Sequence, residues 1–173
     1  MQNFQIDGGA NRKYCIQLEE ALAISPELIH TLVDIDLQTF SVPTFSEYTA
    51  AAFLKNGRVF LLKADDIVIG TCVCIRCWER PNEMMVLSMG IRPGWRGRGL
   101  GQEFIGRVLG RLHQKGCHSV SLMVGSDNKR AIKVYTDVGF EVVEEEYTDP
   151  HTSEVLLHMR KKLRDEGVLI TLP

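Results

Sequence analysis

The succession of a strand, a glycine-rich loop, a helix and a second strand in the middle of the chain constrains the fold more than any other feature. Residues 84–91 (MMVLSMGI) form an apolar run typical of a buried strand, and residues 94–101 (GWRGRGLG) follow it. Apolar residues then recur at helical spacing from Gly99 to Gly116, and residues 119–124 (SVSLMV) return to a strand pattern. Strands joined through a helix in this way form a right-handed crossover, so we expect these two to be parallel.

The remaining elements surround this unit with hairpins. The clearest helix start is Ser25-Pro26-Glu27, where an N-cap serine and a proline at the first helical position begin a helix that we expect to reach about residue 40. Periodicity and turn residues predict further helices at 46–55 and 128–138, and strands at 13–18, 59–63, 67–78, 140–147 and 154–159. The sequence therefore predicts an α/β protein with a mixed, mostly antiparallel sheet of about seven strands flanked by about four helices.

Length and composition favour one cytoplasmic domain spanning 1–173. The chain has 173 residues, a size that one hydrophobic core serves, and it shows no repeat or linker composition. The formal net charge of -2 argues against nucleic acid as a partner, because a surface that follows phosphates needs a basic excess. No apolar run is long enough for a membrane helix, and residues 1–15 lack the pattern of a secretory signal.

The cysteines do not predict a metal site. The chain has 5 cysteines, an odd number, and a cytoplasmic protein is expected to keep them reduced. Cys72, Cys74 and Cys77 lie close together, but Cys72 and Cys74 fall inside a strand pattern, with no second pair and no paired histidines to complete four ligands. We expect no bound metal.

The glycine-rich loop fits neither of two common phosphate-binding motifs. Gly99-Leu100-Gly101 lacks the third glycine of the dinucleotide-binding fingerprint, and no lysine followed by serine or threonine appears where a P-loop requires it. What remains is a set of backbone N–H groups at a helix N-terminus, with Arg96 and Arg98 adding charge, which suits a pyrophosphate without metal. A glycine-rich turn with solvated arginines is the alternative.

Two motifs resemble the GNAT superfamily, the acyl-CoA-dependent N-acyltransferases. Arg96-x-x-Gly99-x-Gly101 after a strand matches the pattern Q/R-x-x-G-x-G/A, and residues 128–140 (NKRAIKVYTDVGF) are similar to the family's second motif. The resemblance implies two splayed parallel central strands, with acetyl-CoA entering the gap between them. It also implies transfer of an acetyl group to a primary amine by direct attack in a ternary complex.

The resemblance also implies which residues hold the donor. The backbone of Met89, Gly90 and Ile91 is expected to meet the pantetheine arm, with one N–H facing the thioester oxygen. The pyrophosphate is expected on the loop, whose residues are Arg96, Gly97, Arg98, Gly99, Leu100 and Gly101. Asn128 is expected to reach the cofactor from the other wall, and it also suits a helix N-cap.

Tyr135 matches the family's general acid, which donates a proton to the coenzyme A thiolate as it leaves. In isolation a tyrosine on a helix face is more simply a core residue. The acceptor amine must lose its proton before attack, because amines are mostly charged at neutral pH. Glu83 and Glu79 are candidate bases, and a solvated carboxylate at a hairpin end is the alternative for both.

The acceptor itself is not identified by the sequence. The acidic run 141–149 could attract a cationic amine or form a solvated edge, and the aromatic candidates for the acceptor pocket, all of which also suit core packing, are Phe40, Phe45, Tyr48 and Tyr147. The tail 161–173 suits an added strand, a contact in a homodimer, or disorder. Two alternatives to a small-molecule acetyltransferase stay open: a protein N-terminal or lysine acetyltransferase, and an acyl-CoA-binding module without turnover.

Overall fold

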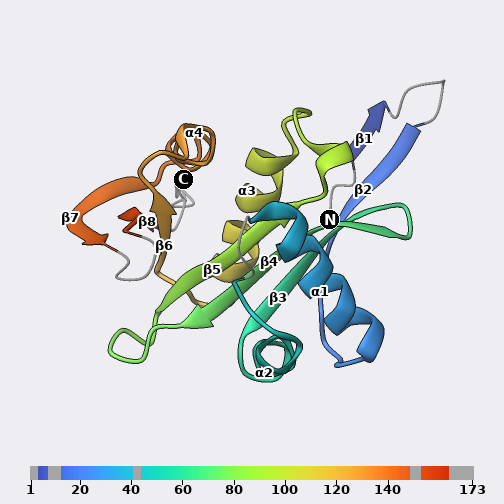
Figure 1. The fold of residues 1–173 in the computed structure, drawn as a ribbon, viewed down its shortest axis with the longest axis horizontal. Helices are drawn as coiled ribbons and strands as arrows, with labels where there is room; N and C mark the ends of the chain where they lie inside the picture. The colour runs from blue at the N-terminus through green and yellow to red at the C-terminus, as the bar shows by residue number, and fades with distance from the viewer. Residues whose placement is uncertain (1–3, 8–12, 41–43, 149–152, 164–173) are drawn as a thin grey trace, which may run out of the picture.

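The computed structural model describes residues 4–7, 13–40, 44–148 and 153–163, and these form one sheet with helices on both faces (Figure 1). The helices are α1 (Pro26–Thr39), α2 (Glu47–Asn56), α3 (Leu100–Gln114) and α4 (Lys129–Asp137), with a 3-10 turn at Pro93–Trp95. The strands are β1 (Phe4–Asp7), β2 (Lys13–Glu20), β3 (Arg58–Ala64), β4 (Ile67–Arg76), β5 (Glu83–Ile91), β6 (Ser119–Gly125), β7 (Glu141–Thr148) and β8 (Val155–Lys162).

The sheet confirms the predicted fold class. Its order is β1-β2-β3-β4-β5-β6-β8-β7, and every neighbouring pair is antiparallel except β5 and β6. The described residues form 8 strands where about seven were expected, because Phe4–Asp7 pairs with β2. A segment of 4 residues is too short to show a strand period in the sequence.

The helices pack in pairs on opposite faces of the sheet. Side chains of α3, among them Phe104 and Ile105, pack with Tyr135 of α4 and the strands into the larger core. On the other face Leu32 of α1 and Ala50 of α2 cover a smaller core. Figure 1 shows the two pairs separated by the strands. Both faces of the sheet are therefore covered by helices.

The two central strands separate partway along their length. β5 and β6 pair only from Glu83–Val86 to Ser119–Leu122. At that point β5 carries a bulge, because Val73 and Cys74 of β4 pair with Ser88 and Val86 and leave Leu87 as an extra residue. Beyond it the backbone groups of β5 that face β6 have no strand partner. The parallel strands are therefore splayed as expected, and the bulge marks where the gap opens (Figure 1).

Parts of the expectations lie outside the described residues. Lys161 and Lys162 end β8, whereas residues 164–173 of the tail are not described. The side chains of Glu144, Glu145 and Glu146 are likewise not described, so the role of the acidic run stays a prediction. Among the described residues, no helix is long and apolar enough to cross a membrane.

Candidate active site

A cavity of about 780 Å³ occupies the gap between β5 and β6. Its walls come from β5, the glycine-rich loop, the end of β6, the start of β8, α4, and the end of α1 with the residues after it. The sequence-predicted residues that line it are Met89, Ile91, Arg96, Gly97, Gly99, Leu100, Gly101, Asn128 and Tyr135. Residues from two motifs more than 25 positions apart in the sequence thus border one space.

The glycine-rich loop presents backbone N–H groups to this cavity. Gly97 and Gly99 have φ values of 79° and 75°, a left-handed conformation that glycine adopts without strain. Within the described part of the chain, the N–H groups of Gly97, Gly99, Leu100 and Gly101 donate to no protein acceptor, and helical bonding begins with Glu103 N to Gly99 O. Free N–H groups at the positive end of α3 form a site for an anion.

The two arginines of the loop have different roles in the structure. Arg96 Nε donates to Ile91 O and its Nη2 donates to Gln38 O, both at 2.7 Å, so its side chain ties the loop to β5 and α1. Arg98 does not border the cavity; its guanidinium lies over the Trp95 ring, 5.4 Å from the centroid. The loop therefore offers an anion mainly backbone groups, with positive charge nearby.

Tyr135 combines burial with a donor that no protein group uses. It is 8% exposed, its ring meets Phe140 edge on, and among the described residues its hydroxyl has no hydrogen-bond partner. Burial, and then the neighbouring thiols of Cys72 and Cys74, raise the pKa of Tyr135 well above its usual value. The phenol is therefore protonated at neutral pH and can donate a hydrogen bond into the cavity.

Asn128 caps α4 and borders the cavity at the same time. Its Oδ1 accepts a hydrogen bond from Ala131 N at 3.1 Å, the N-cap contact that the sequence suggested. Its side-chain amide N–H groups have no acceptor within the described ranges. They can donate to a ligand while the oxygen caps the helix.

Glu83 lies outside the cavity lining, at the end of β5 where β5 and β6 still pair. Its carboxylate is 3% exposed and accepts hydrogen bonds from Arg80, Ser119 and Ser121, all between 3.0 and 3.1 Å. It also forms an ion pair with Arg160, whose Nε lies 3.3 Å away. Burial raises the pKa of Glu83, but these partners outweigh burial and hold the pKa below its usual value. This placement does not favour Glu83 as the base. Glu79 is likewise absent from the lining.

Gly90 also lies apart from the cavity lining, facing α1. A Cβ at Gly90 would lie 2.3 Å from Thr39 Oγ1 and 3.2 Å from Ile35 Cγ2. Because Gly90 has no side chain, α1 can approach β5 closely. This close approach places the end of α1 beside the cavity.

The end of the cavity next to α1 contains residues that the sequence did not single out, together with one that it did. Phe40 lines the cavity as expected, whereas Phe45 packs against Phe53, and Tyr48 and Tyr147 are exposed. The additional lining residues with polar or aromatic side chains are Thr39, Thr44, Ser88, Trp95, Gln102, Arg130, Lys133, Asp137 and Glu154. Arg130, Lys133 and Asp137 belong to α4 and fall inside the quoted stretch 128–140, whereas Thr39, Thr44 and Glu154 lie outside both motifs, so no local motif could have grouped those three with the rest.

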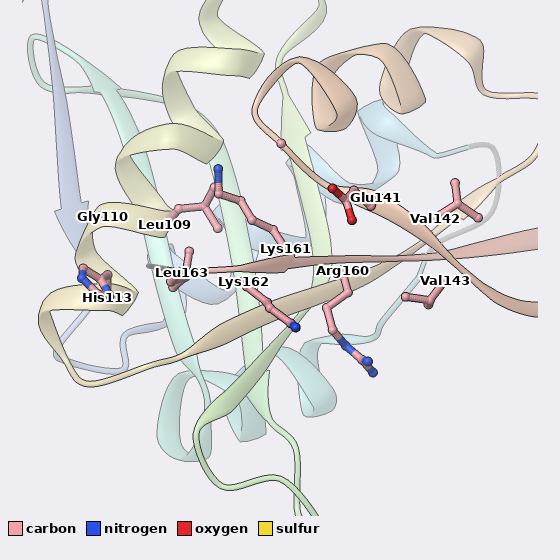
Figure 2. Close-up of a pocket in the computed structure, with 11 residues that line it drawn as sticks. Leu109, Gly110, His113, Glu141, Val142, Val143, Arg160, Lys161, Lys162 and Leu163 are labelled. Carbon is pink, nitrogen blue, oxygen red and sulfur yellow. The ribbon is translucent and has the colours of Figure 1, made fainter. Parts of the chain in front are cut away.

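A second cavity, of about 970 Å³, lies between the last turns of α3, the start of β7 and the end of β8 (Figure 2). Figure 2 shows Arg160 and Lys161 leaving β8 on opposite sides, and Lys161 Nζ donates to Val138 O. Leu163, the last residue described, lies at its edge. Glu141 of the acidic run lines this cavity, but none of the predicted donor-binding or catalytic residues does.

Three of the cysteines, Cys72, Cys74 and Cys117, are buried in the described structure. All 5 are free thiols, and Cys72 and Cys74 are buried with their Sγ atoms 3.8 Å apart. Among the described residues, no group of three or more potential ligands is placed to hold a metal ion.

A splayed parallel strand pair, free backbone N–H groups at a helix N-terminus and a buried tyrosine thus border one cavity. In comparison with known families, residues 25–140 match the acetyltransferase (GNAT) family. The chain belongs to this family.

Curated relatives match over part of their length. A mycothiol acetyltransferase of Corynebacterium aurimucosum is 40% identical over 60 residues, covering 35% of this chain and 20% of that protein. The N-alpha-acetyltransferase MAK3 of Arabidopsis thaliana is 30% identical over 116 residues, 65% of this chain and 59% of that protein. The chain thus spans less than two thirds of the length of these relatives.

Solved structures show the same fold at low sequence identity. The ribosomal-protein-S18-alanine N-acetyltransferase of Escherichia coli has a TM-score of 0.73 at 17% identity, covering 91% of this chain and 99% of that chain. The structure of yncA, a putative acetyltransferase from Salmonella typhimurium, with its cofactor acetyl-CoA has a TM-score of 0.67 at 17% identity. It covers 87% of this chain and 96% of that chain.

Proposed function

We propose that the protein transfers an acetyl group from acetyl-CoA to the α-amine of a peptide N-terminus. The main support for acetyl-CoA as the donor is the cavity between β5 and β6. The free N–H groups of the loop and Tyr135 both line this cavity. In this proposal the pyrophosphate lies on the N–H groups of Gly97–Gly101, and the pantetheine arm pairs with the unpartnered backbone of β5 near Met89 and Ile91. Arg130 and Lys133 add positive charge at the α4 wall.

Acetyl-CoA supplies the activated acyl group, and the protein supplies position and protons. The amine nitrogen attacks the thioester carbonyl carbon, and a β5 backbone N–H stabilises the charge on the carbonyl oxygen. As the carbon–sulfur bond breaks, the sulfur keeps the electron pair and takes a proton from Tyr135. The amide nitrogen gives up its extra proton to water, and Tyr135 regains a proton from water, which restores the enzyme. Its raised pKa makes Tyr135 a hydrogen-bond donor that transfers its proton only as the charge on sulfur develops.

Two lines of support favour an α-amine as the acceptor. An α-amino group with a pKa near 8 is neutral in about one molecule in ten at pH 7, whereas a lysine near 10.4 is neutral in fewer than about one in a thousand. The Arabidopsis thaliana relative, which matches 65% of this chain, is named an N-alpha-acetyltransferase. The Escherichia coli enzyme with the same fold is named for an alanine of a ribosomal protein. Phe40 and Thr44 line the α1 side of the cavity, and in this proposal the peptide end lies there, next to the splayed strands.

The test is an acceptor screen that follows free thiol release from acetyl-CoA. We expect peptides with free N-termini to be acetylated, with kcat/KM at least about tenfold above that of N-blocked peptides that carry a lysine, since the pKa difference alone makes the α-amine far more often neutral. Mass spectrometry would locate the acetyl group on the α-nitrogen. Acetylation of lysine alone would refute the α-amine acceptor.

The binding module without turnover is tested by the same samples. Calorimetry should show acetyl-CoA binding to the wild-type protein. Binding without thiol release in the presence of any amine would support the module, and no binding would refute the proposed donor site.

A further inference from the structure

Asp36 of α1 is a buried carboxylate that the proposed chemistry does not use. It is 2% exposed, and among the described residues no lysine, arginine or histidine forms an ion pair with it. Its neighbour Asp34, by contrast, pairs with Arg92 at 2.5 Å. A buried charge without a cationic partner is costly unless hydrogen bonds or a ligand compensate it.

The hydrogen bonds to Asp36 come from two residues that line the cavity. Thr44 Oγ1 and Ser88 Oγ both donate to Oδ1, at 2.5 and 3.1 Å, and Thr44 N donates to Oδ2 at 2.6 Å. Thr44 follows α1, and Ser88 lies on β5 directly after the bulge at Leu87. The carboxylate therefore lies behind the cavity wall, where β5 turns away from β6.

These contacts fix what the two hydroxyl groups can offer to a ligand. Each hydroxyl has a single proton and two lone pairs, and both protons are committed to the Asp36 carboxylate. Toward the cavity, Thr44 and Ser88 can then act only as hydrogen-bond acceptors. The buried negative charge adds a potential that favours a cation in the same place.

We infer that Asp36, acting through Thr44 and Ser88, forms a subsite that receives the N–H groups of the acceptor amine. This inference rests on the proposed function and names the residues that orient its nucleophile. The two hydroxyl oxygens accept hydrogen bonds from the ammonium or the neutral amine, which directs the amine toward the thioester between the strands. A carboxylate or another group without donors is disfavoured there. Asp36 is a positioning residue, because it acts through the two hydroxyl groups.

The test compares two peptides that differ only in the amine. The probes are the tetrapeptide amide Ala-Ala-Ala-Ala-NH₂ and propionyl-Ala-Ala-Ala-NH₂, in which hydrogen replaces the N-terminal amine. Calorimetry on protein saturated with coenzyme A measures both affinities without turnover. We expect the wild type to prefer the amine by about tenfold or more, as hydrogen bonds from a charged donor provide.

The variants separate positioning from simple structural support. Thr44→Val and Ser88→Ala each remove one acceptor, and Asp36→Asn lets its amide donate to the hydroxyls so that their protons turn to the cavity. We expect each variant to lower the amine preference, with Asp36→Asn bringing it within about twofold, while coenzyme A affinity changes by less than about twofold. Thr44→Ser keeps the hydroxyl and should keep the preference. Glu27→Gln neutralises a carboxylate at the start of the same helix and should also keep it.

The outcomes distinguish this inference from the function on which it rests. Loss of preference in the hydroxyl variants with retained coenzyme A affinity supports it. No preference in the wild type, no measurable affinity for either peptide, or full preference in Thr44→Val and Ser88→Ala would overturn it, even if Asp36→Asn fails to fold. Absence of thiol release from the wild type with every amine would instead refute the proposed transfer.

Discussion

At the scale of single residues, Tyr135 is the group whose environment best matches a chemical role. Burial raises its pKa, and Phe140 holds its ring in place. Tyr135→Phe keeps the ring contact and removes the proton donor. We expect kcat to fall by about 10²- to 10⁴-fold, the usual worth of general acid catalysis, with acetyl-CoA affinity changed by less than about twofold. Steady-state kinetics and calorimetry measure the two quantities.

The matched control for this prediction is Tyr48→Phe, since Tyr48 is 84% exposed and lies outside the cavity lining. It should leave both quantities unchanged. A wild-type kcat in Tyr135→Phe would mean that Tyr135 is not the general acid and serves only in packing.

Glu83 is expected to act on stability. Glu83→Gln weakens the contacts with Arg80, Ser119 and Ser121, and we expect a loss of about 1–3 kcal/mol in the free energy of unfolding at pH 7. Because the pKa of this carboxyl is lower in the folded chain, its stabilising effect is complete above the unfolded value of about 4.3. It is lost as the pH falls through the lower folded value.

Urea unfolding of the wild type and Glu83→Gln from pH 7 to pH 3 measures this difference, which should shrink only below about pH 4. Turnover per folded molecule should stay within a few fold of wild type. A folded Glu83→Gln variant that has lost turnover would make Glu83 the base after all.

The sequence reaches some of these residues and misses others for a physical reason. Arg96, Gly99, Asn128 and Tyr135 belong to short motifs whose spacing is fixed by a local turn or helix, so one sequence reveals them. Thr44, Ser88 and Asp36 meet through contacts that span 8 and 52 positions. Such contacts depend on how α1 lies across β5, which no local pattern encodes.

At the scale of elements, the strong periodic segments were predictable and the irregularities were not. The four helices and seven of the strands appear within a few residues of their predicted bounds, since each carries a long apolar period or a capping signal. The sequence did not predict the bulge at Leu87. A mostly apolar strand has no clear alternation of apolar and polar residues, so one extra residue leaves no sign in the pattern. Yet this bulge marks where the cavity opens.

The two glycines of the loop motif are predicted to serve different purposes. Gly99 has φ of 75°, so Gly99→Ala forces alanine into a left-handed conformation and should cost about 1 kcal/mol or more in stability. A Cβ at Gly101 would lie 3.8 Å from Val134, an ordinary contact, so Gly101→Ala should leave stability equal or raised by up to about 1 kcal/mol.

Acetyl-CoA binding should distinguish them further. Gly101 lines the cavity at the helix N-terminus, so an added methyl group takes space that the proposed pyrophosphate needs. We expect Gly101→Ala to weaken acetyl-CoA binding by about tenfold or more in calorimetry, a loss of about one hydrogen bond to a charged group. Thermal unfolding of both variants provides the stability comparison. A Gly101→Ala protein with wild-type affinity would place the pyrophosphate elsewhere.

At the scale of the whole molecule, charge is divided along the cavity. Free N–H groups with Arg96 and Arg98 lie at the loop, while the Asp36 carboxylate lies behind Thr44 and Ser88 near α1. Although the net charge is only -2, the proposed anionic donor and cationic acceptor would each meet a group of opposite sign. Composition alone could exclude a strongly basic surface but could not show this division.

Arg96 connects the two ends, since one guanidinium holds Ile91 O of β5 and Gln38 O of α1. Gln38 precedes Thr39 and Phe40, which line the acceptor side. Arg96→Ala should therefore raise both the Kd of acetyl-CoA and the KM of the amine by about tenfold, because it frees the loop and the end of α1 together. Arg96→Lys should restore little, because an ammonium lacks the planar fork that reaches both carbonyls.

Arg98→Ala provides the comparison, because Arg98 carries the same charge but contacts Gly94 O and the Trp95 ring and does not line the cavity. It should weaken acetyl-CoA binding only modestly and in a salt-dependent way, with the amine KM unchanged. Calorimetry at low and high salt, together with amine titrations at saturating acetyl-CoA, measures both effects. Equal changes in Arg96→Ala and Arg98→Ala would mean that charge, and not the connection between loop and helix, is what Arg96 contributes.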